Sequence, residues 1–501
     1  MILDKLLKDV KVRKVYLTNK PDVKGLSINS KAVQAGDLFT AIIGFKNDGH
    51  DFAIEAVKNG AIAVMSQRKL DLPADIAQII VLNSRRELPI ICRNFYGDPT
   101  RDILLTGITG TNGKTTSVFL INSIFKSAGY KTSYITTVSA QVGDKKLVFE
   151  RTTPESIDLK KFFYTSRSEG VKTACMEVSS HSIDLHRADF LCFDYFVFTN
   201  LTQDHLDWHE NMKNYFETKL RLFSSQYRGI FGGKGAVINV DDSYGREIAK
   251  STDLKTFTYG IENNSADLRA ENIINSITGI KMDLIYNLKD FRSPLNMEDR
   301  FSIESNLCGY FNVYNILASC GAGLINGLSV KNIQEGIKSM TGVNGRFEKI
   351  VTNKGINAIV DYAHTPDGLE NVLKTAKLLL SPGGRLISVF GCGGDRDKMK
   401  RSIMGGISAG LADFTIITSD NPRTEDPELI IKMIENGFRQ LKKTNYVIEV
   451  DRKNAIFNAL TMSDKKDIVL IAGKGHEDYQ EFADKRIHFS DQEIVKEWDR
   501  N

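Results

Sequence analysis

The segment Ile103-Leu-Leu-Thr-Gly-Ile-Thr-Gly-Thr-Asn-Gly113-Lys114-Thr115-Thr116 joins an apolar run to a glycine-rich turn and then to a helical pattern that begins at Lys114. In such a turn the backbone N–H groups and the positive end of the helix dipole face one point. Lys114 adds a mobile cation there, and Thr115 offers a hydroxyl to Mg²⁺. The segment therefore predicts a strand, a phosphate-binding loop and a helix that together hold a nucleoside triphosphate.

The loop departs from the strict phosphate-loop pattern, because Ile108 stands where that pattern has its first glycine. The shorter form Gly110-Thr111-Asn112-Gly113-Lys114-Thr115-Thr116 remains. An ordinary glycine-rich connection between a strand and a helix is the alternative interpretation. Gly-Lys-Thr directly after an apolar run favours phosphate binding.

Length and composition limit the class of protein. A chain of 501 residues exceeds what one hydrophobic core usually serves, so we expect two to four domains. The 66 basic and 62 acidic residues are dispersed, and a formal charge of +4 gives no case for a nucleic-acid partner. Six cysteines without a CxxC pair indicate reduced core residues and a cytoplasmic protein. No apolar run approaches the roughly 18 residues of a membrane span, so we expect no membrane association.

Alternating strand and helix patterns predict an α/β protein with three domains, at residues 1–98, 99–337 and 338–501. The first is a small α/β domain with a helix at 51–59 and a strand at 61–65. The second has a mainly parallel sheet and the phosphate loop, and the irregular segment 253–310 extends it. Its expected strands are 103–109, 171–178, 194–199 and 235–240, and its helices 114–128, 156–169 and 212–225. The third is a doubly wound sheet with strands at 356–361, 385–390, 413–419, 445–450 and 467–472.

Several polar side chains follow the strands of the central domain. Glu177 ends a strand at a position suited to Mg²⁺, although a solvated strand-end glutamate is the alternative. A short loop from Asp204 to His209 gathers histidine and aspartate side chains. Lys219 lies in the apolar stripe of its helix, so its ammonium must reach water, pair with an anion or be chemically changed.

In the third domain, four polar or glycine-rich loops follow strands at one edge of the sheet, which is typical of a binding face. The side chains of Arg396, Arg423 and Glu477 together could hold both a carboxylate and an amine, as an amino-acid substrate requires. Turn formation is the alternative for any single loop.

The motifs resemble, in their order, those of the Mur ligases. They are Gly110-Thr-Asn-Gly-Lys-Thr-Thr116, Glu177-Val-Ser-Ser-His181, Asp204-His-Leu-Asp207, Asn312-Val-Tyr-Asn315, Gly345-Arg-Phe-Glu348, Asp361-Tyr-Ala-His-Thr-Pro366, Asp420-Asn-Pro-Arg423 and Gly473-Lys-Gly-His-Glu477. The resemblance implies a domain for the UDP end of a substrate, a central ATPase and a C-terminal Rossmann-like domain for an amino acid. It also implies an ATP-dependent ligase that adds the third residue of the peptidoglycan stem peptide through an acyl phosphate.

The resemblance further implies roles for individual residues. The catalytic set would be Lys114, Lys219, His205 and Glu177, with magnesium, expected as two ions, held by Thr115, Glu177, His205 and Lys219. Lys219 matches a lysine that the family carbamylates with CO₂, which gives N6-carboxylysine. ATP would also contact the phosphate loop, Gly110 to Thr116, together with Asn312, Arg346 and Asp361.

The UDP-linked substrate would contact Ser30, Thr152, Thr153, Ser179 and Arg187. Two departures affect this set: Asn29-Ser30-Lys31 replaces the commoner Asp-Ser-Arg, and Leu185 stands where glutamine is frequent. The loop Asp420-Asn421-Pro422-Arg423 resembles the form that selects meso-diaminopimelate, with Arg396, Gly473 and Glu477 around the free end of that amino acid.

Other functions fit parts of the sequence. The chain could add L-lysine instead, or glutamate to a folate. A GTP-binding switch protein is a further alternative, because Asn19-Lys20-Pro21-Asp22 fits NKxD and Asp242-Ser-Tyr-Gly245 fits DxxG. The order of these two motifs around the phosphate loop opposes that function. For the ligase we expect a monomer with three small-molecule substrates: the UDP-muramoyl dipeptide, meso-diaminopimelate and ATP.

Overall fold

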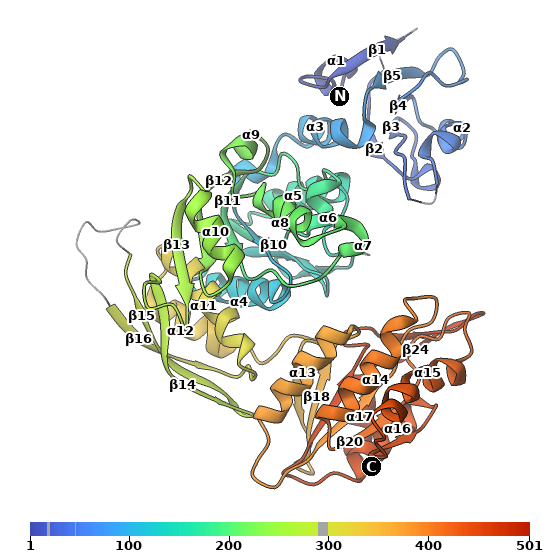
Figure 1. Cartoon of the computed structure of the whole chain (residues 1–501). Coiled ribbons are helices and arrows are strands. Elements are labelled where there is room, and N and C mark those ends of the chain that lie inside the picture. The colour runs from blue at the N-terminus through green and yellow to red at the C-terminus, as the bar shows by residue number, and fades with distance from the viewer. Residues whose placement is uncertain (18–20, 46, 150, 289–298, 501) are drawn as a thin grey trace. The chain divides into compact units, whose positions relative to one another are not determined.

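The structure, a computed structural model, describes residues 1–17, 21–45, 47–149, 151–288 and 299–500 (Figure 1). It is a mixed α/β fold with three main sheets, as the sequence predicts. The chain divides into two compact units, each of which is described by itself. The first contains residues 1–269, 285–300 and 314–336, and the second contains residues 270–284, 301–313 and 337–501.

The N-terminal sheet has five strands in the order β1-β5-β4-β3-β2. They are β1 (Val12–Tyr16), β2 (Gly25–Ser27), β3 (Asp37–Thr40), β4 (Ala63–Ser66) and β5 (Ala77–Val81), and only β1 pairs antiparallel. The helix expected at 51–59 is an α-helix only over α2 (Ala53–Lys58), because Gly49–Phe52 forms a tighter 3₁₀ turn. Apolar side chains of the strands pack against helix α3 (Ser84–Tyr96).

The central sheet has eleven strands in the order β16-β15-β14-β13-β12-β11-β6-β10-β7-β8-β9. The pairs from β7 through β14 in this order are parallel, whereas β8 and β9 pair antiparallel at one edge. The segment expected to be irregular supplies four of the strands. The strands are β6 (Leu104–Thr109), β7 (Thr132–Ile135), β8 (Ala140–Val142), β9 (Lys145–Leu147), β10 (Thr173–Glu177), β11 (Phe193–Phe198), β12 (Gly232–Asn239), β13 (Lys255–Gly260), β14 (Leu268–Ser276), β15 (Gly279–Tyr286) and β16 (Asp299–Ser305).

Helices pack on this sheet and fix the position of the phosphate loop. Apolar side chains of α5 (Ser156–Ser168) and α8 (Met212–Leu220) share one core with β6, β10 and β11. The other helices include α4 (Lys114–Ser127), α6 (Ser180–Asp184), α7 (Leu206–His209), α10 (Ser243–Ser251), α11 (Phe311–Ile325) and α12 (Val330–Ser339). The prediction that the helix at 212 continues to 225 is wrong. Leu222 and Phe223 are buried from a turn after α8, so their apolar spacing imitates another helical turn.

The C-terminal sheet has the order β17-β18-β22-β19-β20-β21. Five strands are parallel as predicted: β18 (Asn357–Asp361), β19 (Leu386–Phe390), β20 (Phe414–Ile417), β21 (Tyr446–Ile448) and β22 (Ile468–Ala472). A sixth, β17 (Glu348–Val351), pairs antiparallel with β18, and its mixed composition gives no clear strand signal. A hairpin of β23 (Tyr479–Glu481) and β24 (Arg486–His488) follows β22.

Helices lie against the C-terminal sheet (Figure 1), and two separate hydrophobic cores pack between helices and sheet. One involves α13 (Pro366–Leu378), α14 (Met399–Leu411) and α15 (Pro427–Gln440), and the other involves α16 (Arg452–Thr461) and α17 (Asp491–Arg500). Helices on both faces of a parallel sheet make this a doubly wound fold. Ligands of such folds bind beyond the carboxyl ends of the strands, where the polar loops of this domain lie.

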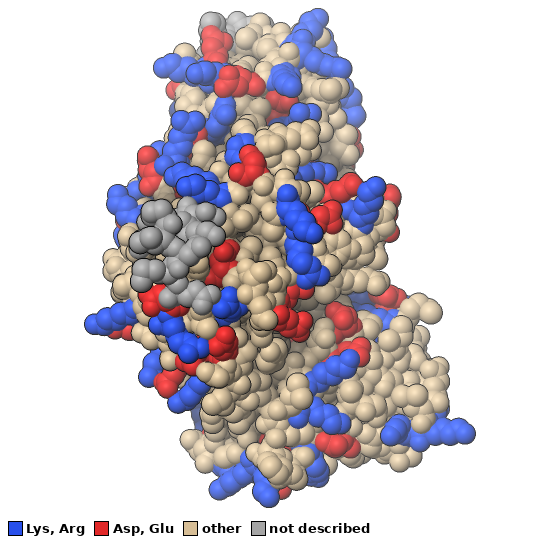
Figure 2. Space-filling view, turned by 60° about the vertical axis from the view of Figure 1, so that its left-hand side comes forward, with Lys and Arg blue, Asp and Glu red and all other residues tan. Residues whose placement is uncertain are grey.

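The surface and the cysteines agree with the composition. All six cysteines are free thiols, and only Cys192 is not fully buried. Figure 2 shows basic and acidic side chains interspersed on one face. Among the described residues, no helix combines the length and the apolar character needed to cross a bilayer.

Candidate active site

A glycine-rich loop joins the carboxyl end of β6 to α4, where the sequence predicts a phosphate-binding loop. Gly110 and Gly113 have φ values of 144° and 84°, which favour glycine. A Cβ atom on Gly110 would lie 1.9 Å from Thr199 Oγ1, and one on Gly113 would lie 2.2 Å from Asn315 Oδ1. Both positions therefore require glycine, and Gly113 is the N-cap residue of α4.

Two side chains at the start of α4, Lys114 and Thr115, form hydrogen bonds at the glycine-rich loop. Lys114 Nζ donates to the carbonyls of Gly110 at 3.0 Å and Thr111 at 2.7 Å, so the side chain folds over the loop. Thr115 Oγ1 donates to Glu177 Oε1 at 2.7 Å. This pair joins the first turn of α4 to the end of β10, and its hydroxyl and carboxylate oxygens suit Mg²⁺. Substrate phosphates and water commonly complete such a site.

Glu177 is buried, and both oxygens of its carboxylate accept hydrogen bonds. Besides Thr115, its carboxylate accepts from Thr137 N at 2.9 Å and Thr137 Oγ1 at 3.2 Å. The same hydroxyl of Thr137 lies 3.0 Å from Thr152 Oγ1. Thr137, which sequence reasoning missed, thus connects the expected metal ligand to the expected substrate-binding residues. It follows strand β7 without a recognisable motif.

Four of the five residues expected to bind the UDP-linked substrate lie close together. Thr153 Oγ1 is 2.9 Å from the carbonyl of Glu177 and 3.3 Å from Ser179 Oγ, and Arg187 Nη1 is 3.4 Å from the carbonyl of Thr153. Thr152 joins them through Thr137. A further residue missed by the sequence analysis, Glu155, pairs with Arg187 Nε at 3.0 Å and with Arg85 and Arg151. The sequence signal for Glu155 is its position in the segment Thr152-Thr153-Pro154-Glu155, next to two residues expected to bind the substrate.

The fifth residue of that set, Ser30, lies in the N-terminal domain. Its hydroxyl donates to Glu55 Oε2 at 2.5 Å, and its carbonyl accepts from Asn59 Nδ2 at 2.9 Å. These bonds hold the short helical turn after β2 against α2. Within the part of the chain that the structure describes, these hydrogen bonds do not join Ser30 to any of the other four residues.

Lys219 is completely buried, so its ammonium does not reach water, which is one of the three outcomes expected for a lysine in the apolar stripe. Its Nζ atom donates to the carbonyl of Gly110 at 3.0 Å, lies 3.3 Å from Thr109 Oγ1 and stands 4.9 Å from the centre of the Tyr215 ring. Burial, and secondarily the charge of Lys114, lowers the pKa of Lys219 well below its usual value. Among the described residues it forms no ion pair that would oppose this shift toward the neutral amine.

His205 belongs to a histidine cluster beside Lys219. Its backbone is left-handed, with φ 54°, and its ring centre lies 4.8 Å from that of His181. Burial lowers the pKa of His205 to about 4, with Asp204 opposing this shift. A neutral imidazole is the form that binds metals. Across the described residues, however, no group of three or more His, Cys, Asp and Glu side chains is arranged to hold a metal ion.

The second unit contains the other residues expected to bind ATP. Asp361 accepts from Phe347 N at 2.6 Å and from Ala363 N at 2.8 Å, and loss of hydration raises its pKa. The guanidinium of Arg346 lies 5.0 Å from the centre of the Tyr362 ring, and its buried Nε has no partner among the described residues. Asn312 is buried in the first turn of α11 and donates to the carbonyl of Cys308 at 2.7 Å.

The loops after β19 and β20 are joined by hydrogen bonds. Arg423 donates from Nη1 to the carbonyl of Gly394 at 2.8 Å and from Nε to Glu481 Oε2 at 2.9 Å. Its φ of 50° is rare for a residue with a side chain. Arg396 is exposed and donates only to its neighbour, Asp395, among the described residues. Beneath the loops, the buried Arg401 pairs with both oxygens of Glu425.

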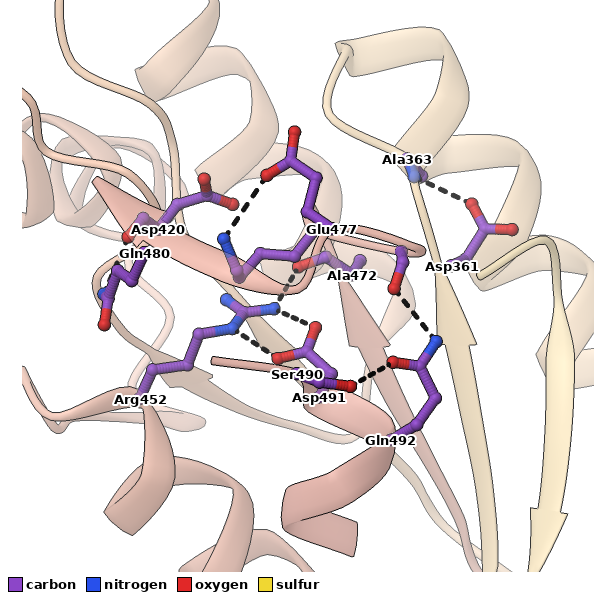
Figure 3. A network of polar contacts seen from close by, with 12 residues as sticks. Asp361, Ala363, Asp420, Arg452, Ala472, Glu477, Gln480, Ser490, Asp491 and Gln492 are labelled. Atoms are coloured by element: carbon purple, nitrogen blue, oxygen red, sulfur yellow. Dashed lines mark hydrogen bonds and ion pairs between the residues drawn. The ribbon is translucent and has the colours of Figure 1, made fainter. Parts of the chain in front are cut away.

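Asn421 and Glu477 of the expected amino-acid site are hydrogen-bonded, and the remaining residues of that site lie beside them. Asn421 Nδ2 donates to Glu477 Oε2 at 2.8 Å. Asp420 is buried, Pro422 follows Asn421 in the same buried turn, and a Cβ atom on Gly473 would lie 2.5 Å from Asp420 Oδ2. Below this turn, Figure 3 shows Arg452 paired with Asp491 and bonded to the carbonyl of Ala472. Figure 3 thus shows a buried ion pair that supports the loop after β22.

The motifs that suggested a GTP-binding switch have little support. Asn19 and Lys20 of NKxD lie outside the described residues. Asp242 of DxxG caps helix α10 by accepting from the backbone of Tyr244 and Gly245 at 2.9 and 3.0 Å. A helix cap explains the spacing of this motif.

Comparison with known protein families gives three matches along the chain. Residues 22–96 match the Mur ligase family catalytic domain, residues 108–323 match the Mur ligase middle domain, and residues 345–475 match the Mur ligase glutamate ligase domain. The matches cover most of each predicted domain, and the order agrees with the order of the motifs.

Individual relatives match over nearly the whole chain. A protein of Clostridium botulinum named UDP-N-acetylmuramoyl-L-alanyl-D-glutamate–2,6-diaminopimelate ligase is 44% identical, over 96% of this chain and 95% of its own. A protein of Clostridium acetobutylicum with the same name and the number 1 is 42% identical, over 99% of each chain. A solved structure with this enzyme name is 32% identical, with a TM-score of 0.67 and 95% of each chain covered.

Proposed function

The chain belongs to the Mur ligase family, and from this premise we propose that it is an ATP-dependent ligase of peptidoglycan synthesis. It adds meso-diaminopimelate to UDP-N-acetylmuramoyl-L-alanyl-D-glutamate and releases ADP and phosphate. The main observation that supports this function is the hydrogen bond between Thr115 and Glu177 next to the glycine-rich loop. It joins the proposed phosphate site to the proposed magnesium site, beside residues proposed to hold the second substrate.

The reaction needs ATP because a carboxylate does not accept an amine directly, since oxide is a very poor leaving group. The D-glutamate carboxylate attacks the γ-phosphorus of ATP, which forms an acyl phosphate and ADP. The amine of diaminopimelate then attacks the acyl carbon, loses a proton, and the tetrahedral intermediate expels phosphate. Lys114 and the loop N–H groups stabilise the charge on the transferred phosphoryl group.

The residues present fit magnesium, expected as two ions. Thr115, Glu177 and His205 would hold it, together with Lys219 in carbamylated form. When bound, Mg²⁺ supplies positive charge that offsets the charge of the phosphates. The hard oxygen atoms of Thr115 and Glu177 support this assignment.

The environment of Lys219 supports its carbamylation by CO₂. A carbamate forms when a neutral amine attacks CO₂ and loses a proton. The buried amine of Lys219 lies near the positive charge of Lys114, which disfavours a second positive charge. It has no ion-pair partner among the described residues. Carbamylation turns this amine into an anion, which explains a lysine at a buried position next to a phosphate loop.

The remaining assignments extend the same proposal. Ser30, Thr152, Thr153, Ser179 and Arg187 contact the UDP-linked substrate, and Asn312, Arg346 and Asp361 contribute to ATP binding. The amino acid is held by Arg396, Asp420, Asn421, Pro422, Arg423, Gly473 and Glu477. The three functional domains are residues 1–98, 99–337 and 338–501. The enzyme is a cytoplasmic monomer.

Amino-acid choice follows from Arg423, whose guanidinium pairs with the distal carboxylate of diaminopimelate. Lysine lacks this group. A phosphate-release assay with ATP and the UDP-muramoyl dipeptide, offered either amino acid separately, tests the proposal. Release that depends on diaminopimelate supports it. Release with lysine alone would replace the amino-acid assignment, and no release with either would reject the ligase.

A further inference from the structure

Lys474 is a buried cation that none of the assignments above uses. It follows β22 by two residues, and its side chain is 0% exposed. Its Nζ atom lies 3.1 Å from Asn421 Oδ1, 3.3 Å from Glu477 Oε2 and 5.2 Å from the centre of the Tyr479 ring. A buried ammonium is costly unless it is paired and hydrogen-bonded, so these contacts determine where it is stable.

Lys474 is one of three groups that fix the orientation of the Asn421 amide. Asn421 Oδ1 accepts from Lys474 Nζ and from Glu481 N at 2.9 Å, and Asn421 Nδ2 donates to Glu477 Oε2. A flipped amide would place its NH₂ group against two donors and its oxygen against a carboxylate. Both ends of the amide therefore favour the same orientation.

Lys474 also holds one oxygen of the Glu477 carboxylate and leaves the other available. Oε2 receives the bonds from Lys474 and Asn421, whereas Oε1 forms no hydrogen bond with any residue that the structure describes. In Figure 3 one oxygen of Glu477 lies on the dashed contact and the other points away from the network. Burial raises the pKa of Glu477, and the nearby Asp420 adds to this, while Lys474 opposes both.

We propose that Lys474 is a positioning residue for amino-acid selection. Its buried ammonium orients Asn421 and Glu477, so that Oε1 of Glu477 accepts a hydrogen bond from the ammonium of the incoming amino acid. This inference rests on the proposed function, because it assigns a ligand to the network around Asn421. It adds a residue that itself does not touch the substrate. The chemistry recognised is a free α-amino acid whose ammonium meets a preset carboxylate.

The test compares Lys474→Met and Lys474→Gln with the matched control Lys453→Met. Lys453 belongs to the same domain and pairs with Glu497 at 2.6 Å, but both side chains are about half exposed. We expect both Lys474 variants to raise KM for diaminopimelate by about 10- to 100-fold, the effect of losing a charge-assisted bond. The KM for ATP, the KM for the UDP-linked substrate and kcat stay within about threefold, and Lys453→Met leaves all four unchanged.

A double-variant cycle separates positioning from a general structural role. If Lys474 acts through Glu477, Lys474→Gln raises KM for diaminopimelate far less in a Glu477→Gln background than in the wild type. Additive effects in the cycle overturn the inference. So does an equal rise in KM for all three substrates, which indicates general loosening of the fold.

The activity of the wild-type enzyme distinguishes failure of this inference from failure of the proposed function. Should wild-type protein show no amino-acid-dependent phosphate release, the proposed function fails. If the wild type is active and the Lys474 variants keep the wild-type KM for diaminopimelate, the positioning role alone is wrong. Thermal unfolding is measured for every variant, and Lys474→Gln, which keeps a donor, replaces Lys474→Met if the latter does not fold.

Discussion

Replacing Glu177 by glutamine separates its charge from its role as a hydrogen-bond acceptor. In the folded protein Oε1 accepts from Thr115 Oγ1 and Thr137 N, and Oε2 faces the Thr137 hydroxyl. Glutamine keeps an oxygen at the first position and places an NH₂ group at the second. Because the Thr137 hydroxyl can donate to Thr152, 3.0 Å away, it can accept from the new NH₂ group. We therefore expect Glu177→Gln to change stability by less than about 1 kcal/mol.

The loss of charge has a larger effect on metal use. Exchanging a charged partner for a neutral one costs about 1.5 to 3 kcal/mol, which corresponds to about a 10- to 150-fold higher Mg²⁺ concentration for half-maximal rate. Glu177→Ala behaves differently, because it also leaves the half-buried Thr137 N–H without an acceptor, at a cost of about 1 kcal/mol or more in stability. The glutamine variant thus loses metal affinity alone, and the alanine variant loses stability as well.

The assay is a Mg²⁺ titration of initial phosphate release at saturating ATP, with thermal unfolding of the same samples. Glu169→Gln, which removes a partly exposed carboxylate that pairs with Lys131 and Lys145, is the control and keeps the wild-type titration. Wild-type Mg²⁺ dependence in Glu177→Gln would refute the metal-ligand assignment. A loss of stability equal to that of Glu177→Ala would refute the hydrogen-bond reasoning.

Three further variants test other parts of the account. Arg423→Ala should raise KM for diaminopimelate by about tenfold or more while KM for ATP stays unchanged, since the bond lost is charge-assisted; equal loss for both substrates, measured by steady-state kinetics, contradicts the assignment. Lys219→Ala should be inactive and partly restored by short carboxylates, whereas Lys213→Ala, exposed on the same helix, should be active; full activity of Lys219→Ala removes the carbamate from the mechanism. Gly345→Ala should lower the melting temperature more than Gly383→Ala. Both residues have positive φ, but only at Gly345 does the new Cβ atom clash with the backbone, at 2.1 Å from His476 N. Equal decreases in the melting temperature of the two variants would show that the close approach at Gly345 does not affect stability.

The sequence reveals the phosphate loop and the parallel sheets because their signals are local. The backbone of the Gly110 to Thr116 turn requires glycine at Gly110 and Gly113. The periodic apolar spacing places Lys219 in the apolar stripe of its helix, whereas only the structure shows that its ammonium is buried. The end of α8 was not predictable in this way. Leu222 and Phe223 have helical spacing, yet they are buried from a turn, so tertiary packing and not local propensity ends the helix.

Contacts between distant residues lie beyond sequence reasoning. Arg423 bonds to Glu481, 58 residues further along the chain, and Lys474 reaches Asn421 across 53 residues. Neither pair has a spacing that indicates contact, because the pairing depends on which loops meet at the carboxyl edge of the C-terminal sheet. The motifs identify Arg423 and Asn421 as binding residues, but the residues that orient them are visible only in the fold.

The central claim is that phosphate leaves with an oxygen atom from the substrate's carboxylate. The most direct measurement uses UDP-muramoyl dipeptide labelled with ¹⁸O in the reacting D-glutamate carboxylate, with ATP and diaminopimelate, and analyses the products by mass spectrometry. Transfer through an acyl phosphate predicts one ¹⁸O atom in each released phosphate and none in ADP. Unlabelled phosphate, formed together with the amide product, would contradict the account.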